Sequence, residues 1–490
     1  MKKKIGFSLA LVSMFSLNLM ADDTTKFALK PNRTLVYNKK PSKVDSFSKM
    51  FTEGMFYGRI RSNNFYFDWK NEYTTDGGKR LRKDNYAMGL GGSIEYKTAT
   101  FKGFSGEAIF YGSESPVHMD SEDVKYVKAG KDTFSRYEVM TSGNWGLYSL
   151  AVANIDYKIS KTDIRVGRQK FESFLTKSND TKMIPNTFEG AVITSKDLDK
   201  TTIKLAYLTR QKLRDHTTFH DVITFKNADG ERWANNDDSV VHRGLSYENL
   251  KEHGKDTDND LIVAQLDNNS IKNLKVMLNY TAIPSLFSSA TIEAKYKIPF
   301  SGWSVTPAVR YMQQFDNGAG EVGGANLLTV TTGYKNPNSV DSYLVCAKLD
   351  FKFAKTTKLR LGYSSTADKA DIIAPWRGLP TAGYTRAMGQ YNWFANTQTY
   401  LARVDYSLDK AKLVDGMSIM FRYAHQNFDE KKTTIMTDSD VYNFDMIYNA
   451  PFLKGFETRV RFAYVDAKPY DNIKTSPSYT DSRLEFNYLF

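Results

Sequence analysis

The sequence is poor in cysteine, because Cys346 is the only one in 490 residues. A single cysteine cannot form a disulfide within the chain, so backbone pairing and packing must stabilise the fold. After residue 21 the sequence also lacks any stretch approaching the roughly 20 apolar residues that a membrane-spanning helix needs. Together with a mean hydropathy of −0.48, this absence excludes a helical membrane protein.

Proline is also scarce, with 13 residues, whereas tyrosine and phenylalanine are abundant, with 30 and 31. Aromatic residues favour strands, and a disordered secreted chain would contain few of them. No low-complexity tract or Pro/Gly/Ser-rich linker divides the sequence. We therefore expect one folded, strand-rich domain.

The first 21 residues have the pattern of a secretory signal peptide. Lys2 to Lys4 precede an apolar stretch from Ile5 to Met20, and Ala21 precedes two aspartates. The apolar stretch is short and is interrupted by serines, which favours cleavage over a membrane anchor. We predict a signal peptide at residues 1–21, an N-terminal periplasmic segment at 22–52 and the main domain at 53–490.

The formal net charge is +12. A positive balance suits nucleic acid, an acidic surface or an anionic solute as partner. Because the chain is predicted to be exported, nucleic acid is the least suitable of these partners.

Apolar and polar residues alternate with a period of two in segments along the whole mature sequence. Clear examples are residues 55–67, 417–425 and 456–465. About eighteen such segments occur, each close to the roughly 9–11 residues of a tilted membrane strand. The even number is what a closed single-chain barrel requires.

The connections between these segments are alternately short and long. The short ones lie near Ala99, Lys161, Asp199, Asn268, Ser301, Lys355, Asp409 and Pro451, and the long ones cover residues 70–84, 114–145, 171–187, 213–257, 317–338 and 367–395. Outer-membrane barrels have brief periplasmic turns and extended outer loops. The pattern predicts an all-β transmembrane antiparallel barrel in the outer membrane of a Gram-negative bacterium, with membrane lipids around it.

The two faces of each predicted strand differ in chemistry. In residues 456–465, Phe462 and its alternate neighbours are mostly apolar, whereas Arg459 and Arg461 share the other face. A barrel directs apolar residues to lipid and charged residues to a wet lumen. The arginines predicted to line the lumen are Arg59, Arg61, Arg165, Arg310, Arg360, Arg403, Arg422, Arg459 and Arg461.

The chain ends on an alternating segment whose last aromatic residue is Phe490. A soluble domain usually has a polar, mobile terminus. In a barrel the last strand must pair with the first, because hydrocarbon tolerates no unpaired backbone. We expect Phe486, Tyr488 and Phe490 to face lipid, and a strand ending in Phe resembles the signal that the outer-membrane assembly machinery reads.

Residues 164–190, IRVGRQKFESFLTKSNDTKMIPNTFEG, resemble a segment of the OprD-type carboxylate-channel porins. The matching positions are Gly167, Gln169, Asp180, Thr181, Lys182, Met183, Ile184, Pro185, Thr187, Phe188 and Gly190. Lys182 stands where arginine is usual, and Glu189 adds an acid. The resemblance implies an eighteen-stranded channel for small solutes, with loops folded into the pore and lumenal arginines that guide anionic groups.

We interpret residues 171–187 as the constriction loop, with Lys177, Asp180, Lys182 and Pro185 at the constriction. A rim loop is the alternative. Guanidinium groups suit carboxylates because their planar fork binds both oxygens. Such a channel needs no catalytic residue, cofactor or metal ion.

Several alternatives stay open at this level. Roughly half of the lumenal arginines are expected to pair with acids such as Asp405, Asp445 and Glu457 and to brace the wall, since buried charges are usually paired. The function could also be non-selective diffusion, or a plugged barrel that acts as hydrolase or adhesin. The sequence does not distinguish a monomer from a homotrimer.

Two histidines of the segment HTTFH, His216 and His220, have the spacing of a metal-binding pair. Without helical periodicity we expect a solvated loop there. Calcium binding by DTDND at residues 256–260 stays open, although the segment lacks the glycine and the distant glutamate of a calcium loop.

Overall fold

The computed structural model describes residues 27–30, 33–72, 82–127, 132–224, 241–389, 391–432, 437–469 and 476–490. The predicted signal peptide at residues 1–21 lies outside the described residues. The signal peptide and the division at residue 52 therefore stay predictions.

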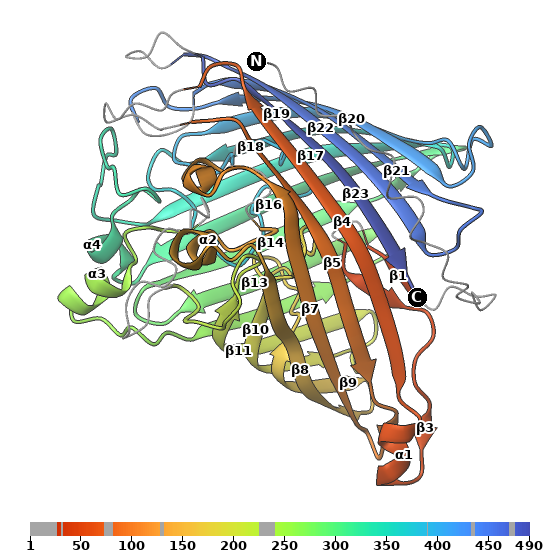
Figure 1. Cartoon of the computed structure of the whole chain (residues 1–490). Coiled ribbons are helices and arrows are strands. Elements are labelled where there is room, and N and C mark those ends of the chain that lie inside the picture. The colour runs from red at the N-terminus through yellow and green to blue at the C-terminus, as the bar shows by residue number, and fades with distance from the viewer. Residues whose placement is uncertain are drawn as a thin grey trace.

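The described residues form a closed antiparallel barrel of eighteen long strands, as predicted (Figure 1). The strands are β4 (Met55–Trp69), β5 (Asn85–Lys97), β7 (Phe104–His118), β8 (Leu147–Ile159), β9 (Thr162–Gln169), β10 (Thr187–Ser195), β11 (Thr201–Lys212), β12 (Leu261–Asn268), β13 (Leu274–Ile283), β14 (Phe287–Tyr296), β16 (Trp303–Asp316), β17 (Ser342–Phe353), β18 (Thr357–Thr366), β19 (Gln398–Ser407), β20 (Met417–Asn427), β21 (Ser439–Asn449), β22 (Phe456–Ala467) and β23 (Tyr479–Leu489).

Shorter elements join the barrel or lie at its two ends. They are the strands β1 (Phe27–Leu29), β2 (Leu35–Tyr37), β3 (Lys43–Val44), β6 (Thr100–Phe101) and β15 (Ile298–Pro299), and the helices α1 (Phe47–Thr52), η2 (Ser121–Tyr126), α2 (Arg136–Ser142), α3 (Tyr247–Glu252) and α4 (Ala319–Gly323). In Figure 1, α1 and β3 lie at the end that holds the C-terminus, and α3 and α4 lie at the opposite end. None of these helices in the described residues is long and apolar enough to cross a membrane.

The barrel closes between its first and last long strands. β23 pairs with β4 over eleven residue positions, from Tyr479 opposite Trp69 to Leu489 opposite Arg59. Phe490 extends this seam, because its N–H and C=O both bond to the backbone of Gly58, at 3.1 and 2.9 Å. The predicted closing strand is confirmed, and its recognition by the assembly machinery stays a prediction.

The alternation along each strand separates a lipid face from a lumenal face. On β22, Phe462 is 40% exposed on the outer surface, whereas Arg459 is buried inside. On β20, Phe421 and Tyr423 face outward and Met420 and Ala424 face inward. This arrangement, with aromatic side chains around a single closed sheet, is that of a membrane barrel and not of a soluble sandwich.

The connections at one rim are short, as predicted, and most at the other rim are long. One connection departs from the predicted alternation, since β13 and β14 are joined at the long-loop rim by residues 284–286 alone. The largest buried apolar cluster combines wall residues with loop residues such as Trp376, Trp393 and Leu175. The long loops therefore fold inward and fill much of the barrel.

Candidate functional site in the lumen

The loop that follows β9 enters the barrel and contacts the inner face of β4. Asp180 accepts hydrogen bonds from Arg59 Nη2 at 2.6 Å and from Arg61 Nη1 at 2.7 Å. Asn63, two residues further along the strand, donates from Nδ2 to the carbonyl oxygen of Lys182 at 2.6 Å. Arg59, Arg61 and Asn63 all face inward, because every second residue of a strand lies on the same face. These three residues hold the loop against β4.

Lys182 belongs to the same loop, and its side chain is almost fully buried. Its ammonium group lies 3.8 Å from the centre of the Phe65 ring and 3.8 Å from Asp132 Oδ2. Burial, with the nearby guanidinium group of Arg483, holds the pKa of Lys182 well below its usual value. Lys182 therefore packs the loop against the wall instead of presenting a charge to water.

A second inward loop, between β18 and β19, joins the first. Thr176 and Arg377 form an antiparallel bridge. The amide of Lys177 donates to the carbonyl oxygen of Trp376 at 2.9 Å, and the amide of Gly378 donates to that of Leu175 at 2.8 Å. The two inward loops are thus paired by their backbones, and the predicted constriction lies where they meet.

Gly378 allows this close approach, because a Cβ atom there would lie 2.2 Å from the backbone carbon of Leu175. We expect Gly378→Ala to push the two loops apart, to cost about 1–3 kcal/mol of stability as in other overpacked sites, and to raise single-channel conductance in a planar bilayer. Gly106→Ala is the control, because a Cβ atom on that wall residue would make ordinary contacts of 3.4 and 3.7 Å. Unchanged conductance in a folded Gly378→Ala barrel would show that this contact does not limit the pore.

A row of arginines lies on three adjacent strands, which β21, β22 and β23 separate from β4. Arg360, Arg403 and Arg422 are direct neighbours on the adjacent strands β18, β19 and β20. Arg360 donates two hydrogen bonds to Asp350, at 2.6 and 3.0 Å, and the Nε of Arg403 donates one to Asp405 at 2.9 Å.

Arg422 differs from its two neighbours. Its Nη1 donates to the carbonyl oxygen of Arg386 at 3.1 Å and to Asn443 Oδ1 at 3.4 Å. Within the described residues no carboxylate lies within 4.0 Å of its guanidinium group, whereas each of the other eight predicted arginines has such a partner. Pairing is therefore more extensive than the predicted half, since the inward loops bury several of these arginines and burial penalises a lone charge.

The remaining predicted arginines have distinct neighbours. Arg165 pairs with Asp156 at 2.6 Å. Arg310 pairs with Glu293 and donates to the carbonyl oxygen of Pro380 at 2.6 Å, so it also holds the second loop. Arg459 and Arg461 share Asp445, at 2.9 and 3.3 Å.

The residues predicted for the constriction itself are mostly covered. Asp180, Lys182 and Pro185 are buried, as are Arg59 and Arg61 on the wall that they contact. The Lys177 side chain is 39% exposed and lies 3.4 Å from Glu172. In this structure Asp180 joins the loop to the wall, whereas Lys177 keeps contact with the lumen.

Other lumenal cations were absent from the prediction. Arg483 on β23 pairs with Asp481 at 2.8 Å, and the alternation of the last strand contains the signal that would have found it. Arg214 and Arg386 lie on inward loops, where no periodic pattern marks the direction of a side chain.

The predicted solvated loop at His216 and His220 is wrong. Both histidines are buried, and their rings share a hydrogen bond between Nδ1 and Nε2 at 2.7 Å. Burial lowers the pKa of His220 to about 4, so its ring stays neutral at pH 7. Among the described residues no group of three or more His, Cys, Asp or Glu could hold a metal ion.

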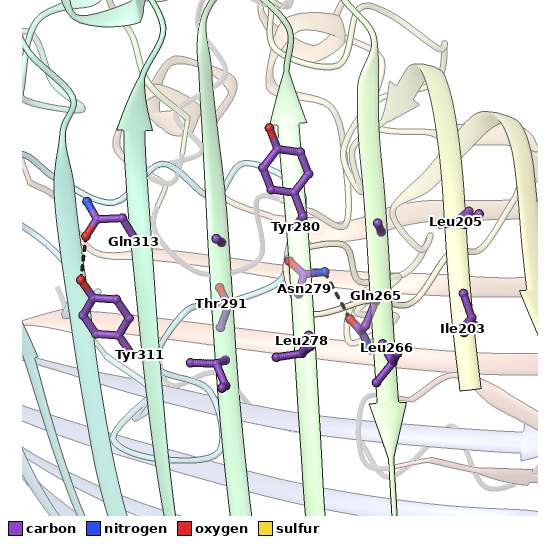
Figure 2. Close-up of a pocket in the computed structure, with 13 residues that line it drawn as sticks. Ile203, Leu205, Gln265, Leu266, Leu278, Asn279, Tyr280, Thr291, Tyr311 and Gln313 are labelled. Carbon is purple, nitrogen blue, oxygen red and sulfur yellow. Dashed lines mark hydrogen bonds between the residues drawn. The ribbon is translucent and has the colours of Figure 1, made fainter. Parts of the chain in front are cut away.

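A shallow apolar groove lies on the outer face of the barrel (Figure 2). Leu205, Leu278 and Tyr311 line it and are all more than 40% exposed. Asn279 and Gln265 are bonded to each other at 3.4 Å and are buried on the lumenal side. The groove therefore faces the membrane and is not part of the path for solutes.

Comparison with known proteins gives one family and one fold. Residues 141–474 match the model of a family described as outer membrane porin, OprD family. No curated protein matches the chain.

Solved porin structures of the same architecture cover most of the chain. OpdQ of Pseudomonas aeruginosa is 16% identical and has a TM-score of 0.62, and the match covers 90% of this chain and 99% of OpdQ. OccAB3 of Acinetobacter baumannii is 16% identical, with coverages of 89% and 99% and a TM-score of 0.65. OpdK of P. aeruginosa, solved with vanillate, is 13% identical, with coverages of 89% and 98% and a TM-score of 0.63.

Proposed function

We propose that this chain, which belongs to the OprD family of outer membrane porins, prefers anionic solutes, and carboxylates in particular, among the small solutes that pass its lumen. Its membership of the family makes it a porin of the Gram-negative outer membrane. The preference for anions is our inference from the charges of the lumen.

The single observation that carries this proposal is the row formed by Arg360, Arg403 and Arg422. The Arg403 side chain is 30% exposed inside the barrel, and that of Arg360 is 11% exposed. A carboxylate can exchange with the acids that already bind these guanidinium groups, and Arg422 offers donors that no carboxylate occupies. Several weak binding sites, placed one after another along the lumen, let a solute pass without being trapped at any one of them.

The charges near the constriction also favour anions over cations. Two buried carboxylates lie there among four guanidinium groups: Asp180 with Arg59 and Arg61, and Asp132 with Arg214 and Arg377. A passage walled by low-dielectric protein focuses the field of such a surplus and concentrates anions.

The OpdK structure contains vanillate, which is an aromatic carboxylate. A ligand of that chemical class is consistent with the proposal, although the low identity carries only the fold. A porin needs no nucleophile, so we assign no catalytic residue.

The test is the reversal potential of the purified porin in a planar bilayer across a potassium chloride gradient. We expect the sign of the reversal potential to show that chloride permeates more readily than potassium, because the arginine row and the constriction attract anions. A second gradient with potassium benzoate should retain that sign. Cation selectivity would contradict the proposal, and a potential near zero would identify a general diffusion porin.

A further inference from the structure

A short hairpin near the N-terminus lies against the lumenal side of the wall. β1 and β2 pair from Phe27 opposite Tyr37 to Leu29 opposite Leu35. Leu29 and Leu35 pack against Tyr57 and Leu489, which are inward-facing residues of β4 and β23. The hairpin is therefore at the end of the barrel where the short turns lie, which in outer-membrane barrels is the periplasmic end.

Arg33, between the two strands of the hairpin, is 2% exposed. Its guanidinium group pairs with Glu457 through Nη2 and lies 3.4 Å from Glu485 through Nε. Both glutamates are buried and lie on the lumenal faces of β22 and β23. The wall thus provides a two-carboxylate receptor for one guanidinium group of the N-terminal segment.

The hairpin and the constriction loop share a contact residue. Arg59 Nη1 donates to the carbonyl oxygen of Arg33 at 3.2 Å, while Arg59 Nη2 donates to Asp180. The hairpin therefore follows the constriction directly on the way to the periplasm.

The hairpin is attached less firmly than the strands of the wall. β1 and β2 form a separate two-stranded sheet, with no strand pairing to the barrel in the described residues. An isolated hairpin is marginally stable in water, so its contacts with the wall must hold it in place. Those contacts include the Arg33 ion pairs, the hydrogen bond from Arg59 to the carbonyl oxygen of Arg33, and the small cluster around Leu29 and Leu35.

We propose that the β1–β2 hairpin is a displaceable plug at the periplasmic mouth of the channel, seated by Arg33 between Glu457 and Glu485. This inference rests on the part of the proposed function that has solutes pass through the lumen, because a plug regulates only a barrel that conducts. With the hairpin seated the exit is narrowed, and with the hairpin released solutes leave through the wider mouth.

The first test is the single-channel conductance of Arg33→Glu. The new carboxylate faces Glu457 and Glu485, so repulsion replaces attraction and the hairpin should leave its seat. We expect a severalfold rise in conductance. The matched control is Lys40→Glu, which makes the same charge change at an exposed residue outside this cluster. Reversal of the nearer wall charge together with Arg33→Glu, as Glu457→Lys, should lower the conductance again.

The second test measures the position of the hairpin without measuring transport. Cys346, the only native cysteine, is replaced in Cys346→Ser, and Thr34, which is 8% exposed beside Arg33, is replaced in Thr34→Cys. A water-soluble maleimide should label residue 34 slowly in the folded barrel and severalfold faster once Arg33→Glu is added.

The outcomes separate this inference from the proposed function. Fast labelling with Arg33 intact, or equal conductance of Arg33→Glu and the original chain, overturns the plug and leaves the anion-selective porin untouched. Slow labelling that Arg33→Glu accelerates, together with higher conductance, supports the plug. This support holds even if the reversal potential shows that the preference for anions is wrong.

Discussion

Replacing Asp180 with alanine should release the constriction loop and increase single-channel conductance, with the barrel itself intact. Asp180 is the shared partner of Arg59 and Arg61, and all three side chains are buried. Removing one partner of a buried ion pair costs about 3–5 kcal/mol, because a charge is left without compensation. Hydrating the two guanidinium groups relieves that cost, and hydration requires the loop to move away from β4.

The barrel should survive this change because its strands are held by backbone pairing, which Asp180 does not enter. Asp197→Ala is the matched control, because Asp197 lies at a short turn and accepts hydrogen bonds from Ser160 and Thr162. Conductance in a planar bilayer is the measurement, with resistance of the folded barrel to heat and detergent measured in parallel. An Asp180→Ala barrel that folds and conducts like the original chain would show that the loop is held by other contacts.

Replacing Arg422 with glutamate should produce the largest loss of anion selectivity of any single lumenal change. Arg422 has no carboxylate within 4.0 Å in the described residues, so the substitution breaks no ion pair. It places a negative charge beside Arg403, which would then bind the new carboxylate and become less available to a solute. We expect the anion-to-cation permeability ratio to fall by up to about tenfold, the lower end of the range for electrostatic steering.

Two comparisons make the Arg422 prediction specific. Lys410→Glu makes the same charge change at an exposed turn residue and should leave the reversal potential unchanged. Arg360→Gln should lower stability as well as selectivity, because it leaves Asp350 without the two hydrogen bonds that Arg360 donates. Equal reversal potentials for Arg422→Glu and Lys410→Glu would show that the arginine row does not select ions.

The barrel could be predicted from the sequence because its physical causes act locally. Hydrocarbon requires every strand to be paired and most outward side chains to be apolar, so the alternation of Phe462 with Arg461 already indicates the two faces. The same rule explains why Phe490 ends the chain in a strand that pairs with β4. The arginines on strands were found by this periodicity, and Arg483 could have been found in the same way.

The function of each arginine could not be predicted, because its partner is remote in the chain. Arg59 and Asp180 are separated by 121 residues, and Arg33 and Glu457 by 424. Loops have no period that marks the direction of a side chain, so nothing local indicates that Asp180 is buried or that Arg33 enters the lumen. The short connection between β13 and β14 also departs from the predicted alternation of loop lengths.

Local alternation and the solvent outside therefore establish the number of strands, the closing pair and the lipid face. The pore depends on long-range contacts instead. Loops and an N-terminal hairpin meet wall charges such as Arg59 inside the barrel. Burial there forces each charge to find a partner, and the spatial arrangement of the whole chain determines which partner it finds.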